Sequence, residues 1–187
     1  MAEIKKDVTR VITGKVRFSY LHVFEPDAID ESSEKKYSAS IIIPKSDKAT
    51  IAAINAAIAA AKEQGKTSKW GGKIPAKLDT PLRDGDIDRE DDEAYAGAFF
   101  VNAKSKSQPG IIDLMKKQIT SEEEFYSGCY GRASLTFYPY DASGNRGIAV
   151  ALNNLQKTSD GEPLSGKVAA DVEFAEDPDF LEDDYLD

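Results

Sequence analysis

The stretch Tyr130–Leu155, YGRASLTFYPYDASGNRGIAVALNNL, has the most regular strand pattern in the chain. Apolar and polar residues alternate from Tyr130 to Tyr140, and a second strand-like run extends from Gly147 to Leu155. The residues between the two runs include Asp, Ser, Gly and Asn, which favour turns. The stretch therefore predicts a β-hairpin.

The two faces of the first strand in this hairpin differ in chemistry. Ala133, Leu135 and Phe137 share one face by the two-residue alternation of a strand, and this apolar face suits a core. The opposite face carries rings, a cation and hydroxyls, which is an unusual composition for a surface that only meets water. Its residues are Tyr130, Arg132, Ser134, Thr136 and Tyr138.

Three further strands are predicted upstream of the hairpin. Residues 8–23 suit a long strand bent at Gly14, residues 37–43 form a second strand that stops at Pro44, and residues 95–104 form a third. In the first strand, alternation places Val16, Phe18 and Tyr20 on one face, with Arg17 and Ser19 on the other. In the third strand, Phe99 and Val101 share one face, and Phe100, Asn102 and Lys104 share the other.

One main helix is predicted, over residues 47–64. Ser46 or Asp47 supplies the N-cap, and Gly65 ends the helix. Within it, isoleucines recur at helical spacing, which indicates a face that packs on a sheet rather than a binding site. These residues are Ile51, Ile54 and Ile58.

Five strands with one inserted helix predict a mainly β (α+β) domain built as a small, curved antiparallel barrel, because strands do not alternate with helices. Residues 1–170 are enough for one such domain. The single Cys129 excludes an internal disulfide and fits a reducing compartment, so we expect a cytoplasmic protein. The charged start MAEIKKDVTR predicts no signal peptide, and no run approaches the roughly 18 apolar residues of a membrane span.

The segment 171–187, DVEFAEDPDFLEDDYLD, holds nine acidic residues and no Lys or Arg. The other 24 acidic residues of the chain equal its 24 basic residues, so the net charge of −9 lies entirely in this segment. A segment of this composition buries too little apolar surface to offset its ordering entropy, which predicts a disordered acidic tail. The tail either competes with a polyanion for the body or only keeps the protein soluble.

Three basic and aromatic elements lie in the body. The first is the loop around Trp70, the second is the outer face of the strand 95–104, and the third is the polar face of the hairpin. Single-stranded nucleic acid requires this mixture, because flat rings stack on unpaired bases while cations track the phosphates. Each ring has an alternative role as part of the core. Without the tail and the acidic loop 79–93, the remaining residues carry a net charge of +6.

An enzymatic function has weaker support from the sequence. The carboxylates of 79–93 are candidates for Mg²⁺ ligands in a metal-dependent nuclease, but their spacing, DGDIDREDDE, does not fit a calcium-binding EF-hand, and dense acidic loops are usually solvated. His22 is the only histidine, and with one cysteine it leaves no zinc site and no catalytic triad. We therefore predict no catalytic residue, no metal and no cofactor.

Several motifs resemble a family of tailed-bacteriophage single-stranded DNA-binding proteins with an OB fold. They occur in order over residues 10–165: GKVRFSYLHVFEP, KYSASIIIPKSDK, PLRDGD, NAKSKSQPG, YSGCYGRASLTFYPYDASGNRGIAVALNNLQK and DGEPL. The resemblance implies a five-stranded OB-like barrel that coats single-stranded DNA in phage replication and recombination. It also implies an acidic tail that restrains DNA binding and recruits phage or host replication proteins. The chain ends in Asp187 and not in a terminal Phe, which weakens the case for docking to a bacterial tail-reading pocket.

The predicted DNA contacts follow from the alternation argument. Trp70, Phe100, Tyr130 and Tyr138 would stack on bases, and Arg17, Lys69, Lys73, Lys77, Lys104, Lys106 and Arg132 would neutralise phosphates. The predicted partner-binding residues of the tail are Phe180, Leu181, Asp183, Asp184 and Tyr185. RNA binding stays open as an alternative, because stacking and phosphate contacts do not read the sugar. A homo-oligomer and an acidic decoy that imitates DNA also stay open.

Overall fold

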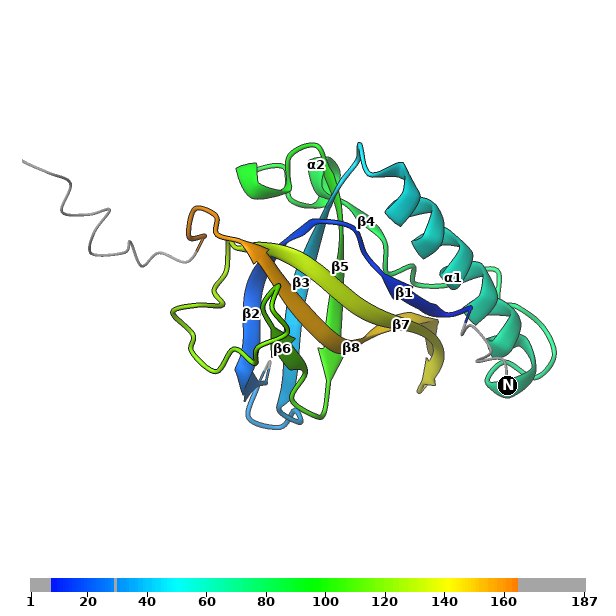
Figure 1. Cartoon of the computed structure of the whole chain (residues 1–187). Coiled ribbons are helices and arrows are strands. Elements are labelled where there is room, and N and C mark those ends of the chain that lie inside the picture. Colours follow the sequence, from blue (N-terminus) through cyan, green and yellow to red (C-terminus); the bar gives the residue numbers. More distant parts are fainter. Residues whose placement is uncertain (1–7, 29, 165–187) are drawn as a thin grey trace, which may run out of the picture.

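The computed structural model describes residues 8–28 and 30–164. The acidic tail predicted for residues 171–187 lies outside this range. Figure 1 shows a curved sheet with one long helix beside it. No helix among the described residues is long and apolar enough to cross a membrane.

Five strands pair in a ring, in the order β2–β3–β5–β8–β7 and back to β2. The ring confirms the predicted OB-like arrangement of five main strands with one main helix. Several strands are longer than predicted, because the sheet pairing continues into the turns. The strands are β2 (Val16–Asp27), β3 (Lys36–Pro44), β5 (Ala98–Ser105), β7 (Tyr130–Ala142) and β8 (Asn145–Ser159).

The ring is not antiparallel throughout, which corrects the predicted antiparallel barrel. β5 and β8 run parallel and meet at one bridge, between Lys104 and Ala151. Strand direction cannot alternate all the way around a ring with an odd number of members, so one neighbouring pair among five must be parallel. The ring closes weakly at this pair, because a single bridge joins the two strands.

Three short strands lengthen the sheet: β1 (Arg10–Ile12), β4 (Arg83–Asp84) and β6 (Gly110–Ile112). β1 and β2 both pair with β7, so the predicted bend at Gly14 is a complete break between two strands. The helix start lies against this glycine, where an added Cβ would come within 2.6 Å of Asp47 Oδ2. β6 pairs with β8, in parallel.

The hairpin of β7 and β8 closes in a two-residue turn. Ala142 pairs with Asn145, leaving Ser143 and Gly144 at the tip. Both tip residues have positive φ, 54° and 90°, which matches the right-handed twist of the strands. The predicted hairpin is therefore confirmed, with a shorter turn than the sequence indicated.

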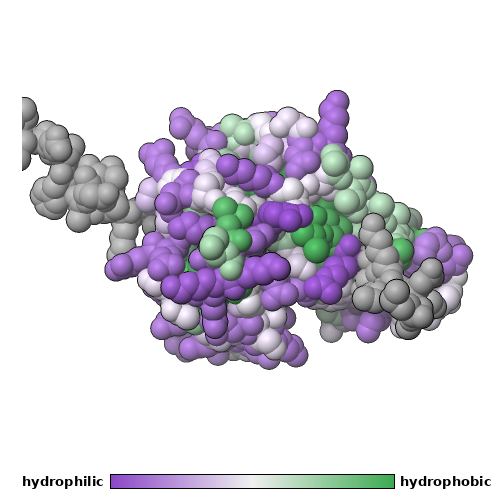
Figure 2. Space-filling model, viewed as in Figure 1, coloured by the Kyte–Doolittle hydropathy of each residue, from purple (hydrophilic) through white to green (hydrophobic). Residues whose placement is uncertain are grey.

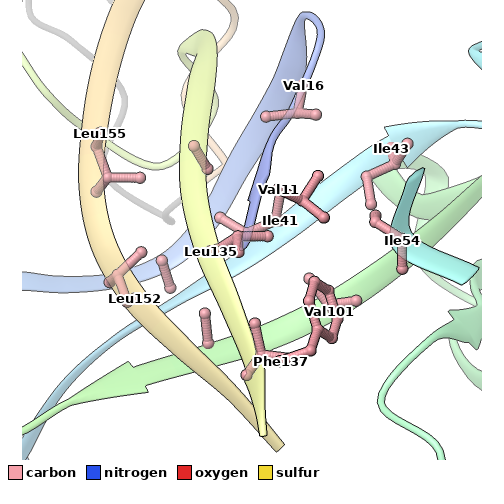
Figure 3. Packing of buried hydrophobic residues seen from close by; sticks show 14 of the residues in the cluster. Val11, Val16, Ile41, Ile43, Ile54, Val101, Leu135, Phe137, Leu152 and Leu155 are labelled. Atoms are coloured by element: carbon pink, nitrogen blue, oxygen red, sulfur yellow. The ribbon is translucent and has the colours of Figure 1, made fainter. Parts of the chain in front are cut away.

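The core fills the ring, and Figure 3 shows side chains from β1, β2, β3, β5, β7, β8 and the main helix meeting there. Phe18, Ile41, Leu135 and Phe137 are fully buried, which confirms the apolar face predicted for β7. Helix α1 (Lys48–Ser68) covers the ring with Ile54 and Ile58, and Ile51 packs at the edge of the cluster. Asp47 caps the helix by accepting hydrogen bonds from Thr50 N and Thr50 Oγ1, at 3.2 and 2.6 Å.

Gly65 does not end the helix, which continues to Ser68. The glycine is buried, and an added Cβ there would lie 2.7 Å from the Trp70 ring and 2.6 Å from Pro139 Cβ. Its carbonyl oxygen accepts hydrogen bonds from Lys69 N and Trp70 N, each at 2.9 Å. The glycine therefore allows the indole to fold back on the last turn of the helix.

Candidate nucleic-acid interface

The outer side of β3 and β5 presents a polar and basic surface. The register pairs Ser38 with Lys104 and Ser40 with Asn102, and all four side chains point away from the core by alternation. The same alternation places Lys36 opposite Lys106, just beyond the end of β5. We call the surface formed by Lys36, Ser38, Asn102, Lys104 and Lys106 the lysine face.

The lysines of this face are available to a ligand. Lys104 and Lys106 are exposed, and Lys104 makes no ion pair with any residue that the structure describes. Lys106 Nζ lies 3.7 Å from Glu34 Oε2, but both side chains are more than half exposed, so this pair contributes little. Lys104 and Lys106 are therefore exposed cations with no strong partner among the residues that the structure describes.

The lysine face continues onto β8, β7 and β1. Lys104 lies opposite Ala151, Ala151 opposite Thr136, and Thr136 opposite Arg10. Tyr138 is the next outward residue on β7 after Thr136, and 42% of its surface is exposed. The predicted residues Lys104, Lys106 and Tyr138 thus lie on one continuous surface.

A second exposed ring, Tyr20, lies at the other side of the face. The register of β2 against β3 shifts between Ser19 and His22, and Tyr20 has φ of 47° in this bulge. Tyr20 is 59% exposed, although alternation placed it on one face with Val16 and Phe18, which are both buried.

The burial pattern of β2 reflects this bulge. Val16, Phe18 and Val23 are all buried in the same cluster, but Phe18 and Val23 are an odd number of residues apart. A regular strand cannot point both inward, so one extra residue must be accommodated between them. Tyr20 was therefore missed as a candidate for base stacking, because a two-residue period was applied across an irregular strand.

The acidic loop covers the far end of the outer surface. Tyr95, in the 3₁₀ helix η1 (Glu93–Tyr95), lies on the sheet with its hydroxyl 2.8 Å from Ser40 Oγ. Burial raises the pKa of the Tyr95 phenol. This tyrosine, Ile42, Ala98 and Phe100 form a small second cluster, which explains why β5 begins at Ala98 and not at Tyr95.

Phe100 points outward as alternation predicted, but it is not a stacking surface. Its exposed fraction is 0%, because Tyr95 meets it edge-on and the Arg89 guanidinium lies 5.2 Å from its ring centre. Burial under the acidic loop corrects the predicted role of Phe100. Beyond the cluster, residues 87–93 and Tyr20 line an open hollow of about 530 Å³.

Arg17 and Tyr130 are paired with each other at the beginning of β7. The guanidinium lies 5.3 Å from the ring centre, and Lys15 Nζ lies 5.0 Å from the same ring. Arg17 Nε donates to Gly128 O at 3.0 Å, and its Nη2 donates to Glu162 O at 2.7 Å. The guanidinium therefore ties the loop before β7 to the segment after β8.

Arg132 lies on the outward side of β7 between Tyr130 and Tyr138, as predicted. It is exposed, and its Nε donates to Thr13 O at 2.9 Å. On the neighbouring strand, Arg10 Nε donates to Ser134 Oγ at 3.2 Å. Each arginine has further N–H groups and an exposed side chain, so both are accessible to an anion.

Trp70 is part of the core, which corrects its predicted stacking role. It is 7% exposed, and its Nε1 donates to Tyr140 O at 3.2 Å. Lys69, Lys73 and Lys77 are exposed on the loop around it, which pairs with the β7–β8 hairpin through Asp79 and Gly147. These three lysines therefore lie on a different element from those of the lysine face.

The carboxylates of the acidic loop serve local structure. Lys45 Nζ lies 2.8 Å from both Asp84 Oδ1 and Asp86 Oδ2, and Asp86 also accepts from Gly97 N. These contacts lower the pKa of Asp86 and raise that of Lys45. Asp84 caps α2 (Gly85–Asp88). Among the described residues, no group of three or more His, Cys, Asp and Glu side chains could hold a metal ion.

The chain was compared with known proteins. A family model described as the single-stranded DNA-binding protein of Enterobacter phage Enc34 matches residues 9–186. The putative protein p50 of Acyrthosiphon pisum secondary endosymbiont phage 1 is 33% identical over 187 residues, which covers 95% of this chain and 98% of that protein.

Solved structures share the fold. The single-stranded DNA-binding protein of bacteriophage Enc34 in complex with ssDNA matches with a TM-score of 0.74 and 24% identity, over 84% of this chain and 90% of that one. The single-stranded DNA-binding protein gp2.5 of bacteriophage T7 matches with a TM-score of 0.54 and 13% identity, over 86% and 97%. The chain therefore belongs to the family of the Enterobacter phage Enc34 ssDNA-binding protein, which is described by DNA binding and not by a catalytic activity.

Proposed function

We propose that this protein binds single-stranded DNA on the lysine face, with Tyr20 and Tyr138 stacking on bases and Lys36, Lys104 and Lys106 contacting phosphates. One observation supports the proposal most strongly. The face places unpaired or weakly paired cations between two exposed rings on the outer side of an OB-like ring. OB folds bind oligonucleotides on this side, across their second and third strands, which are β3 and β5 here.

Binding of this kind has little sequence preference. Every base has a flat π-face, so stacking contributes roughly 1 to 3 kcal/mol per base for any base. The lysines meet phosphates, which carry no sequence information. A duplex keeps its bases stacked inside, so Tyr20 and Tyr138 gain nothing from it, and single strands are preferred.

In the cell, such a protein would coat and protect single-stranded DNA during phage replication and recombination in the host cytoplasm. The acidic tail would occupy the same surface when DNA is absent, because its carboxylates substitute for phosphates. DNA would displace the tail and leave it available to replication proteins. Phe180, Leu181, Asp183, Asp184 and Tyr185 would carry that second contact.

The test measures fluorescence anisotropy of labelled oligo-dT and of a matched duplex against the full chain and a chain lacking residues 171–187. We expect oligo-dT to bind far more tightly than the duplex at low salt. Removal of the tail should tighten DNA binding and reduce the preference for single strands. Equal binding of both DNAs by the full chain would contradict the proposed function, and unchanged affinity without the tail would contradict the competition.

The same samples test the enzymatic alternative. Labelled DNA incubated with the protein and Mg²⁺ or Mn²⁺ should stay intact on a denaturing gel. Cleavage that depends on the metal would instead support a nuclease that uses the acidic loop.

A further inference from the structure

An apolar groove lies on the outer side of the sheet, where β1, β7, β8 and β6 meet. Its volume is about 240 Å³, and its lining includes Ile12, Ile112 and the core residue Leu155, which is 2% exposed. Ile12 is 61% exposed at its rim, which is unusual for a large aliphatic side chain. Figure 2 shows this side of the molecule, where apolar patches near β1 and near β6 interrupt a mostly hydrophilic surface.

The groove is positively charged. Arg132 carries the only formal charge among its lining residues, which also include the amides of Asn154 and Gln156. Arg10 is exposed on the neighbouring strand β1. No carboxylate lines the groove, so it suits a partner that combines apolar and acidic side chains.

The groove borders the lysine face. Arg132 and Thr136 both point outward from β7, four residues apart, which is roughly 13 Å at about 3.3 Å per residue. Thr136 is in the same cross-strand row as Lys104. A segment that begins in the groove would reach the DNA-binding surface within a few residues.

The chain itself contains a segment of matching chemistry. Residues 171–187 hold nine acidic residues and no cation, interspersed with Phe180, Leu181 and Tyr185. The described chain ends at Leu164, whose N–H donates to Ser127 O at 2.8 Å, three residues before β7 begins. The groove is about 20 Å along β7 from that point, whereas the 16 residues to Phe180 span up to roughly 50 Å when extended.

We propose that this groove anchors the acidic segment of the same chain, with Phe180 and Leu181 in the apolar part and the neighbouring carboxylates over the lysine face. The inference rests on the proposed competition between tail and DNA, and it adds a place where the tail binds beside the DNA. A tether this short gives an effective concentration in the millimolar range, so a weak apolar contact is enough. Such an anchor would let the acidic segment restrain DNA binding even where salt screens its charge.

The first test replaces Phe180 of the full chain with a photoreactive benzophenone amino acid. After irradiation at low protein concentration, peptide mapping of the monomer band should find cross-links to peptides that contain Ile12, Ile112 or Leu155. Excess oligo-dT should reduce them. Cross-links confined to peptides of β3 and β5 would contradict the groove as the binding place of the tail, but would agree with competition between tail and DNA. Cross-links found mainly in covalent dimers would assign the groove to a second copy and overturn the proposal.

The second test uses Ile12→Asn, a change at an exposed rim position that conserves the charge. The readout is the ratio of DNA dissociation constants for the full chain and the chain lacking 171–187. Losing an apolar contact should lower this ratio by roughly threefold to tenfold. Ile87→Asn is the matched control, because Ile87 is 72% exposed but lies on the acidic loop. A ratio unchanged in Ile12→Asn, or lowered equally in both variants, would overturn the anchor.

A ratio near one in the unmodified protein would instead show that the tail does not compete at all. That result would overturn the competition and the anchor together. Oligo-dT binding by the tail-deleted chain would still test the proposed function separately.

Discussion

The lysine face and the Arg17–Tyr130 cluster contain the same chemistry, cations beside rings, yet their surroundings differ. Lys104 and Tyr138 lie on an open surface, and no ion pair within the described part of the chain holds Lys104. Arg17 already donates to Gly128 O and Glu162 O and covers a half-buried ring. The same residue types are therefore free for the proposed ligand in one place and stabilise the fold in the other.

What separates the two regions is hydrogen-bond satisfaction. A guanidinium bonded to two carbonyl oxygens must break those bonds to reach a phosphate, and carbonyls left without a donor cost free energy. An exposed lysine has no protein hydrogen bond to break and loses only hydrating water and side-chain freedom. The first region should therefore govern DNA affinity, and the second should govern stability.

The largest effect is expected from the triple variant Lys36→Ala, Lys104→Ala and Lys106→Ala. Affinity for oligo-dT at low salt should fall by roughly a hundredfold, and the salt slope should decrease by about 2, because each single-strand phosphate contact contributes about 0.7 to it. Anisotropy titrations over a salt series measure both. The matched control removes three lysines of α1, Lys48, Lys62 and Lys66. Equal losses in the two triple variants would show that only total charge matters.

Loss of either exposed ring should have the next largest effect. Tyr20→Ala and Tyr138→Ala should each weaken oligo-dT binding by roughly tenfold, within the 1 to 3 kcal/mol of one stacked base. Tyr20→Phe and Tyr138→Phe should retain most of the affinity, because stacking uses the ring and not the hydroxyl. If the Phe variants lose as much as the Ala variants, the tyrosines act through hydrogen bonds and the stacking model is wrong.

Arg17→Ala should show the opposite pattern. Two carbonyl oxygens would lose their donor, so the free energy of unfolding should fall by about 1 to 2 kcal/mol. DNA affinity of the folded protein should change less than about twofold. Urea denaturation followed by circular dichroism gives the first value, and anisotropy gives the second. A large loss of affinity with normal stability would move Arg17 into the interface.

The smallest effect is expected on stability at acid pH, through Asp160 near the Arg17–Tyr130 cluster. Lys157 Nζ lies 2.7 Å from Asp160 Oδ1, and the Tyr126 hydroxyl donates to the same atom, so the pKa of Asp160 is below its ordinary value of 3.8. A carboxylate with a lowered folded-state pKa stabilises above its unfolded pKa, and that contribution is lost as the pH falls through the folded value.

Asp160→Asn should therefore reduce the stability difference between about pH 6 and about pH 3 that the unmodified protein shows. Urea midpoints at the two pH values measure it. The effect is small because Asp160 is 77% exposed. An unchanged difference would mean that other carboxylates, such as Asp86, account for the acid response.

Much of the fold follows from the sequence because it depends on local patterns. The alternation of Ala133, Leu135 and Phe137 predicted the inner face of β7, and the spacing of the isoleucines predicted the buried face of α1. The bulge at Tyr20 and the parallel closure at Lys104 depend on contacts between distant segments, which no local window contains.

The candidate site was predicted in part for the same reason. Lys104 and Tyr138 lie on exposed outward positions, as alternation required. Alternation gave the correct direction for Phe100 but not the loop that covers it, because the position of residues 85–97 depends on contacts with distant residues, among them the hydrogen bond between Tyr95 and Ser40. Trp70 was misassigned because glycines and lysines surround it in sequence, whereas Gly65 and Pro139 surround it in space.

The buried indole has a practical consequence for spectroscopy. Trp70 is the only tryptophan of the chain, and it is enclosed between the last turn of α1 and the β7–β8 hairpin. Its emission should be that of a ring shielded from water, should shift to longer wavelength on unfolding and should change little when oligo-dT is added. The protein therefore contains an intrinsic reporter of its folded state, with which the thermal melting of free and DNA-bound forms can be compared without an attached dye.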